Sequence, residues 1–205
     1  MAIIKHKEQR VGVFIDAQNL YHSARNLYSR KVNFGEIVKE AVGERKLVRT
    51  IAYVINTESQ EEQPFFEALT KAGIEIKTKD LQIFIDGSKK ADWDVGIAVD
   101  AITIAPKLDA VVIVSGDGDF VPLVEYLQKH SGIQVEAVSF KKSTSSKLIE
   151  AVDDFMNLEE NPSQFLIGYR KKTSRSRIRP QSKPAAKTNS TDKPKPKPRT
   201  RRVKK

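Results

Sequence analysis

The sequence predicts an α/β protein with a central, mostly parallel sheet of five strands and helices on both faces. Three observations lead to this prediction. Residues 111–114 are an unbroken run of β-branched apolar side chains, which is typical of a strand buried on both faces of a parallel sheet. Strand-like and helix-like segments alternate five times, as in successive strand–helix–strand units. The strand-like residues 10–16 and 111–115 also end beside carboxylates, at the edge where such sheets bind ligands.

The first half of the chain is expected to supply two strands and three helices. Residues 10–16 (RVGVFID) and 47–55 are rich in the residue types that favour strands. An amphipathic helix follows the first strand, and residues 34–42 predict a second helix that ends at a glycine. The sequence Ser-Gln-Glu-Glu at residues 59–62 has the spacing of a capping box and predicts a third helix that ends at Gly73.

The second half is expected to contain two short β segments, a helix stopped by Pro106, the buried strand, another helix, a fifth strand and a last helix. The expected bounds of these elements are residues 74–77, 81–85, 89–105, 111–115, 119–130, 133–140 and 143–158. The dipeptide Asp86-Gly87 predicts a turn between the second β segment and the helix. Residues 165–170 are expected to extend or dock the last helix.

The charge is divided unevenly between a globular part and a C-terminal tail. Residues 171–205 hold 15 of the 36 Lys and Arg residues but one of the 26 acidic residues, so the preceding 170 residues carry 21 basic and 25 acidic side chains. The tail is also rich in Pro, Ser and Thr and has almost no apolar surface to bury, which is typical of disorder. We expect one globular domain at residues 1–170 and a disordered tail at residues 171–205 that contacts a polyanion.

The composition excludes several classes of site and of location. There is no Cys, so a disulfide or a thiolate metal site is excluded, and the three His residues lack the paired spacing of a zinc site. No apolar run approaches the roughly 20 residues that span a bilayer. The N-terminus shows no apolar signal segment. These features predict a soluble, cytoplasmic protein without a membrane partner.

Several carboxylates are expected to meet at one edge of the sheet. Asp16 ends the first strand, Asp117 and Asp119 follow the buried strand in a Gly-Asp-Gly-Asp turn, and Asp94 lies near the start of a helix. The two glycines are expected to allow the tight turn by adopting positive φ angles. If the two strands are neighbours, their carboxylates converge. Mg²⁺ or Mn²⁺ suits such an all-oxygen site, and carboxylates with such an ion are typical of phosphodiester cleavage.

Four segments resemble the NYN domain in its bacterial LabA-like branch, within the PIN-like nuclease group, and they occur in that family's order. The segments are VGVFIDAQN, KKADWDVGIAVD, SGDGDFVPLV and STSSKLIEAVDDF, and together they span roughly residues 10–158. The resemblance implies a Rossmann-like PIN fold, a metal site built from acidic residues, and endoribonuclease activity. The basic, Pro-rich tail lies outside the pattern of the family.

Carried over by position, the resemblance assigns catalytic roles to the four acids. It implies that Asp16, Asp94 and Asp117 are metal ligands and that Asp119 is either a ligand or a residue that supports the ligands. The residues expected to bind substrate are Asn19, Lys90 and Ser115, of which Asn19 is alternatively expected to orient Asp16. Asp100 and Asp92 are weaker candidates, because Asp100 does not share a helix face with Asp94 and Asp92 competes with Asp94 in the alignment.

Each of these residues also has a purely structural interpretation, which the sequence leaves open. Asp119, Asp92 and Asp94 are typical helix caps or first-turn acids, and Asp117 and Ser115 are typical turn residues. The structural interpretation of Asp100, Lys90 and Asn19 is that they lie on solvated surfaces. Trp93, beside the expected site, either stacks on a base or packs on the helix.

Three functions remain as hypotheses. The first is a Mg²⁺- or Mn²⁺-dependent endoribonuclease whose tail tethers RNA, structured or ribosomal RNA included, with a homodimer as a candidate assembly. The second is a non-catalytic RNA-binding or regulatory protein with a PIN-like fold and a degenerate site, whose tail binds RNA, DNA or an acidic protein. The third is a phosphotransfer receiver with Asp16 as the acceptor, for which Lys141 and Lys142 follow the last predicted strand. Asp117→Asn separates the first two, since it abolishes cleavage only in an enzyme.

Overall fold

The structure is a computed structural model, and it describes residues 3, 5–56, 62–80, 82–83, 89–90 and 92–170. Ser59 of the predicted capping box, the predicted turn at residues 86–87 and the predicted tail at residues 171–205 lie outside this part of the chain. Within it, no helix combines the length and the apolar character that crossing a membrane requires.

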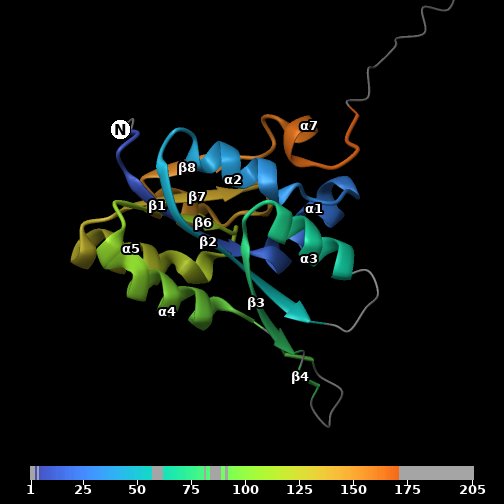
Figure 1. The fold of residues 1–205 in the computed structure, drawn as a ribbon, viewed down its shortest axis with the longest axis horizontal. Helices are drawn as coiled ribbons and strands as arrows, with labels where there is room; N and C mark the ends of the chain where they lie inside the picture. The colour runs from blue at the N-terminus through green and yellow to red at the C-terminus, as the bar shows by residue number, and fades with distance from the viewer. Residues whose placement is uncertain are drawn as a thin grey trace, which may run out of the picture. The chain divides into compact units, whose positions relative to one another are not determined.

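A parallel sheet of six strands forms the centre of the fold, in the order β3-β2-β1-β6-β7-β8 (Figure 1). The strands are β1 (Arg10–Asp16), β2 (Lys46–Asn56), β3 (Glu75–Asp80), β6 (Ala110–Val114), β7 (Gln134–Ser139) and β8 (Asp154–Asn157). This is a Rossmann-like order, in which the chain builds the sheet outward from β1 in one direction and then outward from β6 in the other. β1 and β6 are therefore neighbours at the switch point, and ligands of such sheets bind beside the carboxyl ends of these two strands.

Helices cover both faces of the sheet (Figure 1). One face carries α1 (Ala17–Tyr28), α2 (Phe34–Val42), α3 (Glu62–Lys71) and α7 (Pro162–Phe165). The other face carries α4 (Asp94–Ile104), α5 (Val121–Ser131) and α6 (Ser146–Ala151). Short 3₁₀ turns occur at η1 (Ala105–Lys107), η2 (Gly118–Phe120) and η3 (Lys141–Ser143), and β4 (Gln82–Ile83) pairs antiparallel with β5 (Lys89–Lys90).

Alternating side chains of the strands build two separate apolar cores. In β6, Ala110, Val112 and Val114 belong to the core under α1 and α2, whereas Val111 and Ile113 belong to the core under α4 and α5. All five side chains are buried. β6 has no polar residue because a helical layer covers each of its faces. This confirms the predicted α/β class with a parallel, doubly covered sheet.

The prediction of five strands was wrong, because the chain returns to the sheet after α6. The last helix was expected to run as far as Leu158, but it ends at Ala151. The Asp153 carboxylate accepts a hydrogen bond from the Val135 amide at 2.8 Å, and the Asp153 amide donates to the Val135 carbonyl at 2.8 Å. These bonds place β8 along β7, whose edge would otherwise expose unpaired backbone groups.

The helix expected within residues 89–105 was predicted to start at Asp92 or Asp94, and it begins at Asp94. Lys89 and Lys90, at the start of that segment, belong to the short strand β5. Trp93 marks the start of the helix, because its indole Nε1 donates to the Val54 carbonyl at 3.0 Å and its ring packs against Tyr53. The packing interpretation of Trp93 therefore accounts for its position.

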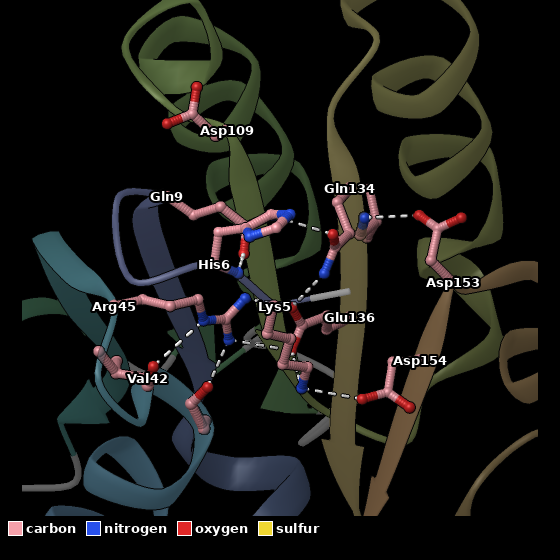
Figure 2. Close-up of polar contacts among 12 residues, drawn as sticks. Lys5, His6, Gln9, Val42, Arg45, Asp109, Gln134, Glu136, Asp153 and Asp154 are labelled. Atoms are coloured by element: carbon pink, nitrogen blue, oxygen red, sulfur yellow. Dashed lines mark hydrogen bonds and ion pairs between the residues drawn. The ribbon is translucent and has the colours of Figure 1, made fainter. Parts of the chain in front are cut away.

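A buried ion pair lies near the amino ends of the strands (Figure 2). The Arg45 guanidinium pairs with the Glu136 carboxylate, and the two side chains are 3% and 4% exposed. Arg45 Nε also donates to the Val42 carbonyl at 3.1 Å, and Lys5 Nζ bridges Glu136 and Asp154 at 2.8 and 2.9 Å. Removing one member of such a buried pair costs about 3–5 kcal/mol. These ion pairs therefore connect β7 and β8 to the segments that precede β1 and β2.

Candidate metal centre

Asp16 lies at the carboxyl end of β1 and at the start of α1. It is the last residue of the strand, and its Oδ1 accepts a hydrogen bond from the Asn19 amide at 3.0 Å, which makes it the N-cap of the helix. The exposed amides at a helix start favour a negative charge. Burial nevertheless raises the pKa of Asp16, with a smaller contribution from the charge of Asp117, and the bonds from Asn19 and Ser115 only partly offset this.

Ser115 and Asn19 join the end of β1 to the loop that follows β6. The Ser115 hydroxyl donates to Asp16 Oδ2 at 3.3 Å and accepts a bond from the Asp117 amide at 3.2 Å. The Asn19 side-chain Oδ1 accepts a bond from the Gly116 amide at 3.0 Å. Both residues were expected to bind substrate, and here the Ser115 hydroxyl and the Asn19 side-chain oxygen bond to the protein. Their substrate contacts stay a prediction, whereas the structure gives them a direct role in aligning the two loops.

Three carboxylates from two loops meet next to this junction. One carboxylate oxygen from each of Asp94, Asp117 and Asp119 lies within 4.8 Å of the other two. Asp94 is the first residue of α4, and Asp117 and Asp119 follow β6. The cap at this turn is Asp117, whose Oδ1 accepts from the Asp119 amide at 3.0 Å. The interpretation of Asp119 as a helix cap is therefore wrong.

The expected ligand set and the observed group overlap in Asp94 and Asp117. Asp119, expected as a ligand or a supporting residue, completes the group of three, whereas Asp16 lies outside it. Asp16 is connected to the group through Ser115, which bonds to both Asp16 and the Asp117 amide. The role of Asp16 as a ligand stays a prediction.

The electrostatics of the group show uncompensated negative charge. The pKa of Asp94 is raised from 3.8 to about 6, first by burial and then by the charges of Asp16, Asp117, Asp92 and Asp119. The four neighbours contribute because their charges are close enough to disfavour a further anion. The raised pKa of Asp94 fits a site where a bound cation would offset the neighbouring negative charges.

The donor set fits a hard divalent ion. The group offers carboxylate oxygens alone, and Mg²⁺ and Mn²⁺ prefer oxygen ligands. Oxygens that lie within 4.8 Å of one another belong to side chains that would be close enough to turn toward one shared ion.

The weaker candidates do not join this group. Asp100, on α4, accepts hydrogen bonds from the Tyr53 hydroxyl and from Lys77 Nζ, both at 2.6 Å. Burial acts to raise the pKa of Asp100, but the bonds from Lys77 and Tyr53 outweigh it and the pKa is lowered. Asp92 is exposed and Trp93 occupies the N-cap position of α4, so Asp92 does not cap this helix. Lys90 lies in β5, and its side chain is outside the described part.

Gly116 and Gly118, in the loop that carries Asp117, are required for a different reason from the one expected. Among the glycines that the structure describes, those with positive φ are 43, 73, 132 and 168, so the expectation for Gly116 and Gly118 was wrong. A Cβ atom on Gly116 would lie 2.9 Å from both Ser139 Oγ and the Ser143 carbonyl, and one on Gly118 would lie 2.7 Å from Ser145 Oγ. The glycines therefore allow close packing of two loops.

The segment STSSKLIEAVDDF supports the acidic loop, a structural role that the sequence did not predict. The Ser145 amide donates to the Gly116 carbonyl at 2.9 Å, so the loop before α6 supports the loop that carries Asp117. Tyr53 and Lys77, which hold Asp100, were also missed. No motif marks them, because their role arises only when β2 and β3 lie beside α4.

A groove of about 350 Å³ opens beside the acidic group, between α4 and α5. Its lining residues are Asp94, Val95, Ala98, Ile102, Asp119, Phe120, Pro122, Leu123 and Tyr126. Two of the three clustered carboxylates therefore border a space that is otherwise mainly apolar.

Comparison with known proteins assigns the family. The NYN domain model matches residues 10–159. The chain is 25% identical over 169 residues to the Low amplitude and bright protein LabA of Synechococcus elongatus. The aligned region covers 75% of this chain and 86% of LabA. A protein of unknown function from Vibrio parahaemolyticus has a crystal structure that matches with a TM-score of 0.72 and 33% identity, over 80% of this chain and 100% of that one. The chain therefore belongs to the NYN domain family of PIN-like nucleases, and it is similar to LabA.

Proposed function

We propose that this protein is a divalent-metal-dependent endoribonuclease that hydrolyses phosphodiester bonds of RNA. The observation that carries the proposal is the convergence of Asp94, Asp117 and Asp119, whose carboxylate oxygens lie within 4.8 Å of one another. The group lies at the carboxyl ends of the two central strands, where sheets of this order bind ligands. Membership of a PIN-like nuclease family supports the same chemistry.

Asp94, Asp117 and Asp119 are the residues that would hold Mg²⁺ or Mn²⁺, and Asp16 is the next carboxylate available. When bound, such an ion neutralises charge on the phosphodiester and lowers the pKa of a water. The contribution of the protein is to hold the carboxylates in place before the ion and the substrate arrive. The hydrogen bonds that Ser115 and Asn19 make across the two loops serve this purpose.

The basic C-terminal segment is proposed to tether RNA. Residues 171–205 carry 15 basic residues and one acid, whereas the rest of the chain has more acids than bases. A surface with an excess of carboxylates repels a phosphate backbone, so a separate cationic segment is needed to hold it. Binding of this kind depends on salt, because about 0.7 counterion is released for each phosphate neutralised on a single strand. Structured or ribosomal RNA is the proposed partner.

The test is to incubate the purified full chain with RNA and DNA oligomers in Mg²⁺, in Mn²⁺ and in EDTA. Wild type is expected to cleave RNA internally with either ion and to be inactive in EDTA. Asp117→Asn is expected to abolish cleavage while RNA binding remains. Asp109→Asn is the matched control, because Asp109 pairs with Arg10 and is not a member of the acidic group.

The same experiment separates the enzyme from the alternative of a non-catalytic RNA-binding protein. RNA binding without cleavage in either ion, and with the same affinity for wild type and Asp117→Asn, contradicts the proposed activity and supports the alternative. Equal loss of cleavage in Asp117→Asn and Asp109→Asn contradicts the assignment of the site.

A further inference from the structure

The edge strand β3 carries a row of charged side chains on the face that points towards α4. Glu75, Lys77 and Lys79 alternate along the strand, so they share one face of the sheet. Ile76, between them, packs against the core on the opposite face. The Lys77 Nζ bonds to the Asp100 carboxylate of α4 at 2.6 Å, and this contact shows that the row faces α4.

The pairing of these charges stops at Lys79. Glu75 accepts two hydrogen bonds from the Arg49 guanidinium, at 2.8 and 2.7 Å, and Lys77 is paired with Asp100. Lys79 is exposed, and among the described residues no carboxylate forms an ion pair with its Nζ. Lys79 is therefore the member of the row whose positive charge is left to interact with another molecule.

Lys79 is held beside Trp93. Its Nζ lies 5.8 Å from the centroid of the Trp93 ring, in the range where the negative face of an aromatic ring attracts a cation. The same Nζ donates to the Asp92 carbonyl at 3.3 Å. The ring is itself held, because its indole Nε1 donates to the Val54 carbonyl at 3.0 Å. These contacts keep the positive charge and leave two of the three ammonium N–H groups available to an anion.

This cation lies close to the acidic group. Asp92, whose carbonyl holds Lys79, is two residues before Asp94, and two residues span at most about 7 Å. Three ionised carboxylates carry more charge than one divalent ion neutralises, so a further cation nearby favours an arriving phosphodiester. A strand with one phosphate at the acidic group can place a neighbouring phosphate at Lys79.

We propose that Lys79 binds a backbone phosphate of single-stranded RNA, next to the phosphodiester at the acidic group, and that Trp93 holds the ammonium in position for it. A side chain that is already held loses less conformational freedom on binding. Because a phosphate is the group recognised, the contact does not depend on the RNA sequence. The inference rests on the proposed function for the RNA at the acidic group, but binding without cleavage is enough to test it.

The test uses Trp93 as a local probe, because it is the single Trp of the chain. The full chain is titrated with a labelled single-stranded RNA oligomer in EDTA, where no cleavage is expected. Trp emission reports contact at Lys79, and the anisotropy of the RNA reports total binding. Wild type is expected to show a saturable change in emission as the anisotropy rises. Lys79→Gln is expected to lose the change in emission but to retain RNA binding through the basic C-terminal segment.

The salt dependence of RNA affinity provides a second measurement. The slope of log affinity against log salt is expected to be smaller in Lys79→Gln than in wild type by about 0.7, the value for one phosphate on a single strand. Lys79→Arg keeps the charge and is expected to keep the wild-type slope. The control is Lys107→Gln, which is expected to behave as wild type. Lys107 is exposed at the end of α4 away from Asp94, and it also has no carboxylate partner among the described residues.

RNA binding that leaves the emission of wild type unchanged overturns the proposal. So does a salt slope that is the same in wild type and Lys79→Gln, or one that falls equally in Lys107→Gln. A failure of the proposed nuclease is a different result, because it appears as absence of cleavage in Mg²⁺ and Mn²⁺ whatever the emission of Trp93 shows.

Discussion

The backbone amide of Gly116 donates a hydrogen bond to Asn19 Oδ1 at 3.0 Å, and this bond joins the first turn of α1 to the loop after β6. Gly116 is buried, so its amide has no water to replace this partner. The Asn19 backbone amide in turn donates to the carboxylate of Asp16, the N-cap of α1. One asparagine therefore connects the strand end that carries Asp16 to the loop that carries Asp117.

Asn19→Ala is expected to destabilise the fold and to weaken the metal site together. It leaves a buried amide without an acceptor, which costs about 1–3 kcal/mol. Urea unfolding measures the loss of stability, and titration with Mn²⁺ measures the loss of affinity. Asn26→Ala is the control, because Asn26 is an exposed residue of the same helix. Equal behaviour of the two variants would mean that the Asn19–Gly116 bond does not organise the site.

Asp94 is expected to make the metal-free protein more stable as the pH falls towards 5. Its pKa is raised from 3.8 to about 6, so the folded state binds this proton more tightly than the unfolded state. The stabilisation from protonating Asp94 is complete below pH 4 and is lost as the pH rises through about 6. The measurement is the melting temperature in EDTA between pH 5 and 7.

The matched variant for this experiment is Asp94→Asn, which cannot ionise. It is expected to melt above wild type at pH 7 and to depend less on pH over this range. A pH dependence identical to that of wild type would contradict the electrostatic strain described for Asp94. Asp16 retains a share of the dependence in both proteins, because its pKa is also raised.

Asp100→Asn is expected to lower stability without abolishing metal binding. The variant loses the carboxylate that accepts hydrogen bonds from Tyr53 and Lys77, at a cost of about 1–3 kcal/mol. Because these bonds fix α4, on which Asp94 lies, Mn²⁺ affinity should fall but remain measurable. Melting curves and Mn²⁺ titrations test this. Complete loss of Mn²⁺ binding with unchanged melting would instead make Asp100 a ligand.

Gly116→Ala is expected to disrupt the packing that supports the acidic loop. The added methyl group would lie 2.9 Å from the Ser143 carbonyl, a backbone atom that cannot rotate away. Overpacking of this kind costs about 1–3 kcal/mol. Gly35→Ala is the control, since its nearest neighbour would be a methyl group at 3.4 Å and alanine favours the helix. Urea unfolding that shows no difference between the variants would contradict the close approach of the two loops.

The parts of the fold that the sequence predicts well are those whose cause is local. The run Val111–Val114 is apolar because β6 is covered on both sides, and the same burial marks β1. Asp16 ends β1 and Asp117 lies in the loop that follows β6, so their approach required only that the two strands be neighbours, as they are.

The remaining features depend on contacts between distant residues, which no local pattern records. Residues 154–157 form the strand β8 and do not continue α6, because the backbone groups at the edge of β7 pair with them. Asp100 turns away from the acidic group because Tyr53 and Lys77 lie beside α4. Gly116 carries no positive φ, and the reason for a glycine there is a loop that follows it by almost thirty residues.

The most direct test of the central claim, that Asp94, Asp117 and Asp119 share one divalent ion, is the titration of the metal-free full chain with Mn²⁺ at pH 7 and at pH 5. Saturable binding is expected to be lost in Asp117→Asn, retained in Asp109→Asn, and weakened in wild type at pH 5, where Asp94 binds a proton. Absence of saturable binding at pH 7, or equal binding by wild type and Asp117→Asn, would contradict the account.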